Sequence, residues 1–163
     1  MSGRAAGENL DVMRAEPVAA SALLRLPVRL HGIELGRPVD LILDRDRRRA
    51  LGLELLCGDA ERRFLPLAAA KLRDDGIEIR SPLVMLERAE LAFYTERGST
   101  LAALRGSTIM RRGENLGALV DLEVAEDGTI ERLVLETQAG RTAVDHGDDL
   151  HFGGIRSAVR RAS

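Results

Sequence analysis

Apolar and polar residues alternate in the same order at two places in the chain. Residues 35–44 read LGRPVDLILD and residues 116–125 read LGALVDLEVA, with Leu, Gly, Val, Asp and Leu at matching positions. The two stretches start at positions 35 and 116, 81 positions apart in a chain of 163 residues. When apolar and polar residues alternate with a period of two, successive side chains lie on opposite faces of a strand. The repeat therefore predicts that one half-buried β-strand occurs twice.

The first half of the chain predicts about five short strands. Val39, Leu41 and Leu43 are every second residue of 39–44, so we expect them on one face of a strand. Pro66 cannot donate to a β-ladder, which predicts an edge strand or a bulge. Frequent turns between short strands are typical of small barrels and sandwiches. The predicted strands are 27–31, 39–44, 50–56, 63–69 and 77–80, with turns at 32–36 and 45–49.

A change of pattern at Pro82 predicts a helical linker over residues 82–105. The stretch LVMLERAELAFYTERG is rich in helix formers, and its apolar residues recur at three- and four-residue steps. Ser99 is suited to cap a second, short helical turn over 100–104. We therefore expect helix, and not strand, between the two β units.

The second half repeats the β pattern of the first. Val120, Leu122 and Val124 are expected on one face, in the same way as the apolar residues of 39–44. The predicted strands are 107–110, 118–125, 130–137, 141–144 and 150–152, with a turn at 126–129. We divide the chain into a flexible N-terminal arm (1–22), a first domain (23–81), the helical linker (82–105), a second domain (106–154) and a basic C-terminal tail (155–163).

The chain resembles the PRC-barrel family in a unit that occurs twice. The unit consists of Leu-Gly-x-x-Val-Asp, a hairpin, a glycine and a proline-containing strand. The first copy carries Leu35-Gly36, Val39-Asp40, FLPLAAA at 64–70 and DDGIEI at 74–79. The second carries Leu116-Gly117, Val120-Asp121 and Ile130 to Leu135, but GRTAVDHGDDLHFGG replaces the proline strand. The family includes the cytoplasmic domain of the photosynthetic reaction centre H subunit and the C-terminal domain of the ribosome maturation factor RimM.

The resemblance implies a mainly β fold of two small PRC-barrel-like β-barrels of short antiparallel strands, joined by the helical linker. Gly36 and Gly117 fall where the chain needs a positive φ or a close approach to a neighbouring strand. The short strands must close or pack together to hide their edges. Whether the two copies pack side by side or interleave strands into one composite barrel stays open.

Composition narrows the classes of function. Hydrophobic residues make up 45% of the chain, enough for a packed core. The 24 basic and 26 acidic residues leave no overall positive field, which argues against general nucleic-acid binding. A lone cysteine, Cys57, cannot form an intramolecular disulfide. The N-terminal residues lack the apolar core of a signal peptide and no apolar run is long enough to span a bilayer, so we expect a cytoplasmic protein without membrane insertion, though with peripheral association open.

Asp40 and Asp121 recur at like positions and form the first candidate site. A functional pair across a pseudo-twofold interface is one interpretation of them. The structural interpretation is favoured: an acid that follows a Gly turn on the exposed face of a strand accepts backbone hydrogen bonds and fixes that turn.

The segment Asp145 to His151, DHGDDLH, is the second candidate, since His and Asp are ordinary Zn²⁺ ligands. The favoured interpretation is a polar loop in which Asp145 and Gly147 form a turn and His146 is solvated. A strand over 150–152 would point His151 away from the Leu150 side. The pair Asp44 and Asp46 lacks the ligand spacing of a Ca²⁺ loop and is expected in a solvated turn.

Cysteine and arginine residues supply the remaining candidates. Cys57 has no catalytic partner signalled, since His31 is distant in sequence, and a buried inert thiol is favoured. Two basic groups could contact phosphate in RNA or a lipid headgroup, but solvated charge is the default, and 2% aromatic residues give no stacking platform for RNA. These groups are Arg45, Arg47, Arg48 and Arg49 in one turn, and Arg156, Arg160 and Arg161 at the end of the chain.

No catalytic motif is present in the sequence, so we expect no enzyme activity, and we assign no catalytic, cofactor-binding or metal-binding residue. The expected function is that of a non-catalytic adaptor or scaffold that binds a protein partner, with homo-oligomerisation open. The alternative is a ribosome-assembly or RNA-processing factor similar to RimM, although only about 22 residues precede the first domain. Metal binding at Asp145 to His151 is a third hypothesis.

Overall fold

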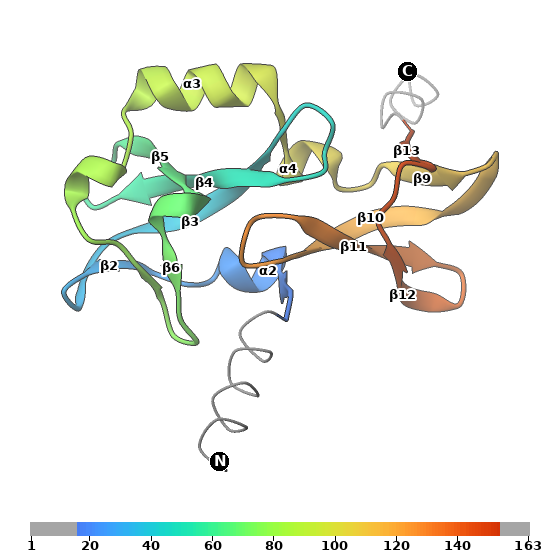
Figure 1. The fold of residues 1–163 in the computed structure, drawn as a ribbon, viewed down its shortest axis with the longest axis horizontal. Helices are drawn as coiled ribbons and strands as arrows, with labels where there is room; N and C mark the ends of the chain where they lie inside the picture. The colour runs from blue at the N-terminus through green and yellow to red at the C-terminus, as the bar shows by residue number, and fades with distance from the viewer. Residues whose placement is uncertain (1–15, 154–163) are drawn as a thin grey trace, which may run out of the picture.

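The computed structural model describes residues 16–153, which form two β-sheets around a shared core (Figure 1). Sheet 1 contains β2 (Val28–Leu30), β3 (Ile33–Leu43), β4 (Ala50–Cys57), β5 (Arg62–Pro66), β6 (Lys71–Leu72), β7 (Ile77–Glu78) and β8 (Ser99–Thr100). Sheet 2 contains β1 (Val18–Ala19), β9 (Thr108–Arg111), β10 (Glu114–Val124), β11 (Ile130–Thr137), β12 (Gly140–Asp145) and β13 (Leu150–Phe152). The helices are α2 (Ala20–Leu23), α3 (Arg88–Arg97) and α4 (Leu101–Leu104), with 3-10 turns η1 (Leu67–Ala69) and η2 (Pro82–Val84).

The order of the strands confirms a mainly β chain built from antiparallel sheets. Sheet 1 runs β5-β4-β3-β2-β7-β6 with β8 beside β3, and sheet 2 runs β12-β11-β10-β9-β13 with β1 beside β10. The pair β2 and β7 is parallel. Strand β5, which ends at Pro66, lies at an edge of sheet 1, as the proline predicts. Neither sheet closes into a barrel within residues 16–153.

Both long strands, β3 and β10, have 11 residues and are longer than predicted. The turn expected at 32–36 consists of His31 and Gly32 alone, with φ of 50° and 83°. Arg112 and Gly113 form the matching turn of the second repeat, with φ of 50° and 79°. Positive φ at both central residues suits a two-residue hairpin, so the chain reverses sooner than a longer loop would allow.

A β-bulge corrects the predicted face of Val39. The β3–β4 register skips Val39 between Pro38 and Asp40, and its side chain is 39% exposed, whereas Leu41 and Leu43 are buried. An extra residue in one strand takes itself out of the alternation. Strand β10 has its bulge at the equivalent Val120. The repeat is therefore preserved down to the irregularities of its ladders.

Two glycines explain why the repeated phrase contains Leu-Gly. A Cβ at Gly36 would lie 2.8 Å from the Leu56 carbonyl oxygen, and one at Gly117 would lie 2.7 Å from the Glu136 carbonyl oxygen. Gly117 also has a φ of 137°. The expected close approach to a neighbouring strand is confirmed at both positions, although both glycines lie inside strands and not in a turn.

The two repeats exchange their first elements. Strand β1 of the first repeat pairs with β10 of the second, with Val18 opposite Val124. Strand β8, which begins the second repeat, pairs with β3 of the first, with Ser99 opposite Leu43. The repeats thus interleave, which answers the question that the sequence left open. Within the chain that the structure describes, the repeats are not separate packing units.

Residues 18–22, which we expected in the flexible arm, form β1 and most of α2. They are held because Ala20 and Leu23 are buried and β1 completes the ladder of β10. Residues 1–15 of the predicted arm, Gly154 and the predicted basic tail at 155–163, with its three arginines, lie outside the described residues.

Asp40 and Asp121 lock the exchange. The Asp121 carboxylate accepts hydrogen bonds from the Ser21 amide at 3.1 Å, from the Ser21 hydroxyl and from the Leu122 amide at 2.9 Å. Asp40 accepts from the Ala102 amide at 3.1 Å and from the Leu41 amide at 2.9 Å. The predicted role as backbone acceptor is confirmed, but the target is corrected: each aspartate fixes the one-turn helix of the other repeat, not its own Gly turn.

The turns β3–β4 and β10–β11 meet between the two repeats. The Ala50 amide donates to the Gly128 carbonyl at 2.7 Å, and the Ile130 amide donates to the Arg48 carbonyl at 2.9 Å. A Cβ at Gly128 would lie 2.7 Å from the Ala50 carbonyl oxygen. One core cluster joins buried residues of both sheets, Leu41 and Leu122 among them. Packing and backbone hydrogen bonds therefore bind the repeats into one unit.

The predicted linker is only partly helical. Helix α3 covers ten residues, 88–97, and Leu91 packs on Ile42 and Phe64 of sheet 1. The cap of α4 is Thr100, whose hydroxyl accepts from the Ala103 amide, whereas the predicted cap, Ser99, lies in β8. The middle segment thus contributes a strand to sheet 1 as well as a helix that covers it (Figure 1).

Asp121→Ala is expected to lower the free energy of unfolding by about 1–3 kcal/mol, because it leaves the Ser21 and Leu122 donors unsatisfied. Asp40→Ala should cost about 1 kcal/mol, since it removes fewer hydrogen bonds. Urea denaturation followed by circular dichroism measures both. The control is Asp46→Ala, at an exposed turn position, which should stay within about 0.5 kcal/mol of the wild type. Equal values for all three variants would contradict the locking role.

Gly98→Ala is expected to destabilise the protein by about 1–3 kcal/mol, because the new Cβ would lie 2.0 Å from the Leu43 carbonyl oxygen and push β8 away from β3. Gly58→Ala is the matched control, since nothing lies within 4 Å of its Cβ position. Thermal melts of the two variants should differ clearly. A Gly98→Ala protein as stable as Gly58→Ala would argue against the β3–β8 pairing.

Candidate interaction surface

A groove lies between α3 and the turn that joins β3 to β4, with a volume of about 620 Å³. We call it the α3 groove. It combines two aromatic rings, three arginines and a leucine with two acids. Its lining consists of Asp44, Arg45, Arg47, Leu51, Phe93, Tyr94, Glu96, Arg97, Gly98 and Ser99.

Three of the four aromatic residues of the chain pack together at α3, and the fourth contacts an arginine of the groove. Phe64 stacks on Tyr94 with ring centroids 4.5 Å apart, and Phe93 contacts Tyr94 edge-on at 5.2 Å. The fourth ring, Phe152, lies beneath the Arg47 guanidinium at 5.2 Å. The sequence has three Phe, one Tyr and no Trp, so the cluster at α3 uses three of the four aromatic residues. Composition alone gave no sign of it.

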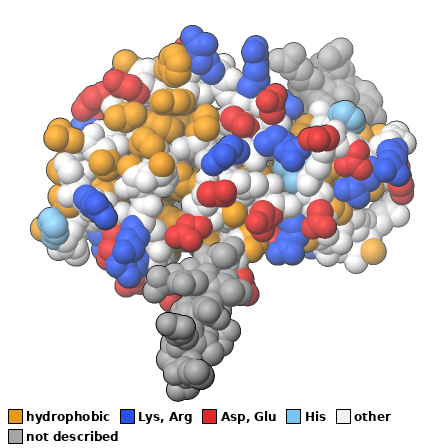
Figure 2. Space-filling model, in the orientation of Figure 1, with side chains coloured by type: hydrophobic (Ala, Val, Ile, Leu, Met, Phe, Trp, Pro, Cys, Tyr) orange, Lys and Arg blue, Asp and Glu red, His pale blue; other side chains and the backbone are white. Residues whose placement is uncertain are grey.

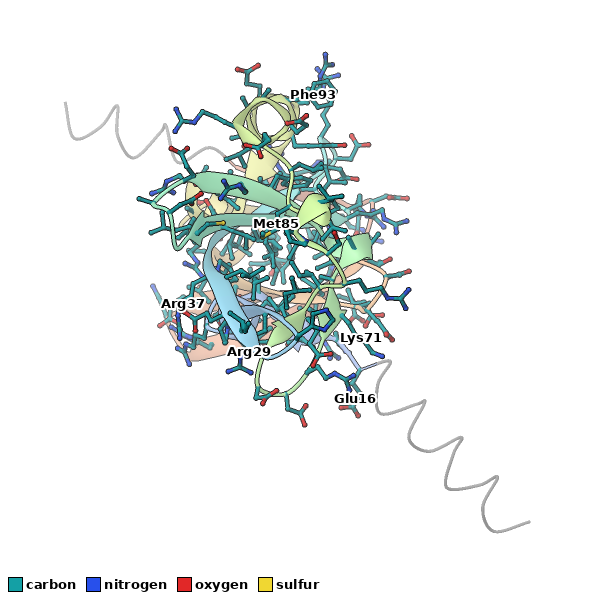
Figure 3. All side chains as sticks on the ribbon, turned by 90° about the vertical axis from the view of Figure 1, so that its left-hand side faces the viewer. Glu16, Arg29, Arg37, Lys71, Met85 and Phe93 are labelled. Carbon is teal, nitrogen blue, oxygen red and sulfur yellow. The ribbon has the colours of Figure 1, made fainter. Side chains whose placement is uncertain are left out.

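Phe93 is placed on the surface by the register of α3. Leu91 and Tyr94, three residues apart, face the sheet, so Phe93 between them points away from it and is 49% exposed. Figure 3 shows Phe93 at α3, at the top of the view. Figure 2 shows that apolar side chains gather over α3 and the strands below it. Leu83, at the η2 turn before the helix, is 87% exposed. Helix α3 thus covers sheet 1 and exposes the Phe93 ring to solvent.

The arginines of the groove differ in their contacts. The Arg97 guanidinium lies 4.3 Å from the centre of the Phe93 ring, and the Arg47 Nε lies 3.4 Å from the Ser99 hydroxyl. Arg45 and Arg97 form no ion pair within residues 16–153. Both guanidinium groups therefore keep hydrogen-bond donors available to a ligand.

The turn 45–49 is less solvated than the sequence suggested. Arg48 pairs with Asp148, and Arg49 donates to the Asp127 carbonyl at 2.8 Å. Asp44 accepts from the backbone amides of Arg48 and Arg49, at 2.8 and 3.2 Å. Arg47 has a φ of 58°, a left-handed conformation that is uncommon for a residue with a side chain. Contacts with the second repeat thus fix most of this turn, and Arg45 and Asp46 face solvent.

The fold directs the charged side chains of residues 145–151 to different partners. Asp148 contacts Arg48, while Asp149 lies 3.2 Å from the Arg111 Nε. His151 is exposed, and Leu150 is buried, as the strand predicted. No group of three or more His, Cys, Asp or Glu side chains in residues 16–153 is arranged to hold a metal ion. The structure therefore gives no support to the metal hypothesis for this segment.

His146 is half-buried and not solvated, in contrast to the prediction. Its Nε2 lies 2.8 Å from the Arg47 carbonyl oxygen, and its amide donates to the Glu131 carbonyl at 2.8 Å. The Nδ1 atom is buried and has no hydrogen-bond partner in the part of the chain that the structure describes. Burial lowers the pKa of His146 below its ordinary value of 6.5, and the nearby Arg48 charge lowers it further. Neutral imidazole with its proton on Nε2 suits the contact with Arg47.

Cys57 is buried and free, which confirms the predicted buried thiol. His31 lies in the exposed turn between β2 and β3, and no hydrogen bond joins it to Cys57.

No described helix has both the length and the hydropathy to cross a bilayer. Comparison of the sequence with protein-family models and with curated proteins gives no match.

The pKa of His146 predicts a loss of stability in mild acid. The unfolded chain takes up a proton as the pH falls through about 6.5, whereas folded His146 resists it, so stability is full above that pH and declines below it. His146→Gln keeps a donor for Arg47 and removes the titration. Between pH 7.5 and 5.5 the wild type should lose more thermal stability than His146→Gln, measured by calorimetry.

The control for this experiment is His151→Gln, at the exposed histidine of β13, which should keep the pH dependence of the wild type. If His146→Gln and the wild type lose the same stability over this pH range, the burial of His146 has no energetic effect.

Proposed function

We propose that the protein is a non-catalytic adaptor that binds a protein partner through the α3 groove. The observation that carries this proposal is that Phe93, Tyr94, Arg45 and Arg97 line one exposed groove, where neither arginine has an ion-pair partner among the described residues. Aromatic residues and arginine are enriched at the centres of protein–protein interfaces, where they supply most of the binding energy. Phe93 is the expected anchor, since its ring is half-exposed and already held against Tyr94.

The lining of the groove indicates the chemistry of the partner. Leu51 and the two rings offer an apolar floor, while Arg45 and Arg97 offer guanidinium groups at its rim. A partner segment with an apolar side chain beside Asp or Glu complements both features. Burying Phe93 would also strengthen the attraction between Arg97 and its ring.

The proposal includes a cytoplasmic location for the protein and a PRC-barrel-like identity for its two repeats. Its support is that the Leu-Gly and Val-Asp motifs occupy equivalent places: Gly36 and Gly117 at a close strand approach, Asp40 and Asp121 at the exchanged helix. The single cysteine is buried and free, so the fold needs no oxidising compartment. In this proposal the interleaved repeats are a rigid platform for the groove.

The alternative, an RNA-binding assembly factor similar to RimM, has less support. RNA would be held by Arg45, Arg47, Arg48 and Arg49, but Arg48 is paired with Asp148 and Arg49 with a backbone carbonyl. The Arg47 guanidinium lies over the Phe152 ring and donates a hydrogen bond to the Ser99 hydroxyl. Only Arg45 of the four extends without a described partner, which is a small basic surface for a polyanion.

The proposal predicts that Phe93→Ser abolishes capture of a specific partner. Tagged wild-type protein, Phe93→Ser and Ile33→Ser are used as bait in the native host, with and without ribonuclease, and the captured proteins are quantified by mass spectrometry. Ile33 is the matched control because it is 66% exposed but lies in β3 outside the groove lining. A loss of roughly tenfold or more is expected for Phe93→Ser alone, as for an anchor residue.

Arg45→Glu should weaken capture of the same partner, and the loss should be larger for a more acidic partner segment. Raising the salt concentration should reduce this capture less than it would reduce binding of a polyanion. Proteins captured equally by wild type and Phe93→Ser would overturn the groove as the binding surface. Capture of ribosomal proteins that disappears on ribonuclease treatment would favour the RNA alternative.

A further inference from the structure

Strand β12 is an edge strand of sheet 2, and no segment of residues 16–153 bridges it. In sheet 1 the equivalent edge, β5, is bridged by the segment before α3: the Phe64 and Leu86 amides donate to each other's carbonyl oxygens at 2.9 and 2.7 Å. Within residues 16–153 no segment pairs with the outer side of β12 (Figure 1). An open edge of this kind is a template for another strand.

The direction of the free backbone groups follows from the register. The His146 amide donates to the Glu131 carbonyl, so His146 and Glu131 form a hydrogen-bonded pair with β11. Hydrogen-bonded and non-hydrogen-bonded pairs alternate along antiparallel strands. Residues 141, 143 and 145 of β12 therefore turn their amides and carbonyls away from β11, toward the open edge. The Arg111 guanidinium donates to the Asp145 carbonyl from that side, which agrees with this assignment.

The side chains of β12 are complementary to a second copy of themselves. If two β12 strands pair antiparallel about a twofold axis at Ala143, Arg141 of each copy lies opposite Asp145 of the other. These residues belong to the outward-facing set, so each pair exchanges two backbone hydrogen bonds. The Asp145 carbonyl oxygen, which also accepts from Arg111, uses its second lone pair for the second copy. Opposite charges directly across a ladder stabilise the pairing, and any shift of register by two residues would lose this match.

The match extends into the sheet on both sides. Within one copy, Glu123 contacts the Arg132 Nε at 2.6 Å, and Arg132 lies opposite Asp145 in the ladder. Glu136 contacts the Arg141 Nε at 3.3 Å. Joining two copies gives a row across the strands that reads Glu123, Arg132, Asp145, then Arg141 and Glu136 of the second copy. Every neighbour in that row has the opposite charge.

We propose that the chain forms a twofold dimer in which the β12 strands of two copies pair antiparallel, centred on Ala143. The occupant of the edge is a second copy, and not an unrelated strand, because the strand Gly140–Asp145 complements its own reversed sequence in charge. The pairing surface is short, so the dimer is weak and depends on protein concentration. It leaves the α3 groove free and does not rest on the adaptor function.

The first test compares wild-type protein with Ala143→Pro by sedimentation over a wide range of protein concentration. The Ala143 amide points to the open edge, so proline there removes a donor used only by the second copy and spares the β11 ladder. Wild type should pass from monomer to dimer as concentration rises, and Ala143→Pro should weaken dimerisation by tenfold or more with an unchanged circular dichroism spectrum.

The second test exchanges charges between copies. Arg141→Asp alone places Asp opposite Asp145, and Asp145→Arg alone places Arg opposite Arg141, so each variant alone should stay monomeric. An equal mixture of the two variants restores both opposite-charge pairs and should dimerise. Wild-type protein that stays monomeric at every concentration, dimers that survive Ala143→Pro unchanged, or a mixture that stays monomeric would each overturn the proposal.

Discussion

The architecture depends on two aspartate carboxylates that hold the exchanged ends of the repeats. Asp121 fixes α2 and Asp40 fixes α4, and in each case the helix belongs to the other repeat. A two-residue strand and a single helical turn such as β1 and α2 are marginal on their own, so these bonds add to the burial of Ala20 and Leu23 and to the β1–β10 ladder. Because the exchange is reciprocal, neither repeat completes its sheet alone.

The same symmetry defines where the repeats differ. Both contain the two-residue hairpin turn, the bulge and the close glycine approach at equivalent positions. Helix α3 and the bridge at Leu86 cover sheet 1 only, and they bring Phe93 and Arg97 to the surface. Among residues 16–153, nothing pairs with the outer edge of sheet 2 at β12. Both proposed interaction surfaces thus arise where the internal symmetry is broken.

The two proposed binding surfaces, the α3 groove and the β12 edge, offer different physical interactions. At the groove, an apolar ring and guanidinium groups favour a side chain that removes Phe93 from water. At the edge, backbone donors and acceptors favour a strand, and the charges of Arg141 and Asp145 select its direction and register. A dimer through β12 would present two grooves, which raises the avidity for a partner with two binding segments.

The sequence by itself determined the strands 50–56 and 130–137, the edge position of Pro66 and the equivalence of the two repeats, because hydrophobic period and proline chemistry are local properties. It did not determine the ladder partners of residues 18–19 and 99–100, the exposure of Val39, or the neighbours of Asp40 and His146. It also did not reveal that Phe64 would stack on Tyr94 beneath α3, or that Phe152 would contact Arg47 of the groove. These features depend on pairings that the local pattern does not specify, from Asp40 opposite Glu54 to Val18 opposite Val124. Only the tertiary structure decided them, since sequence period specifies which face is buried but not what it is buried against.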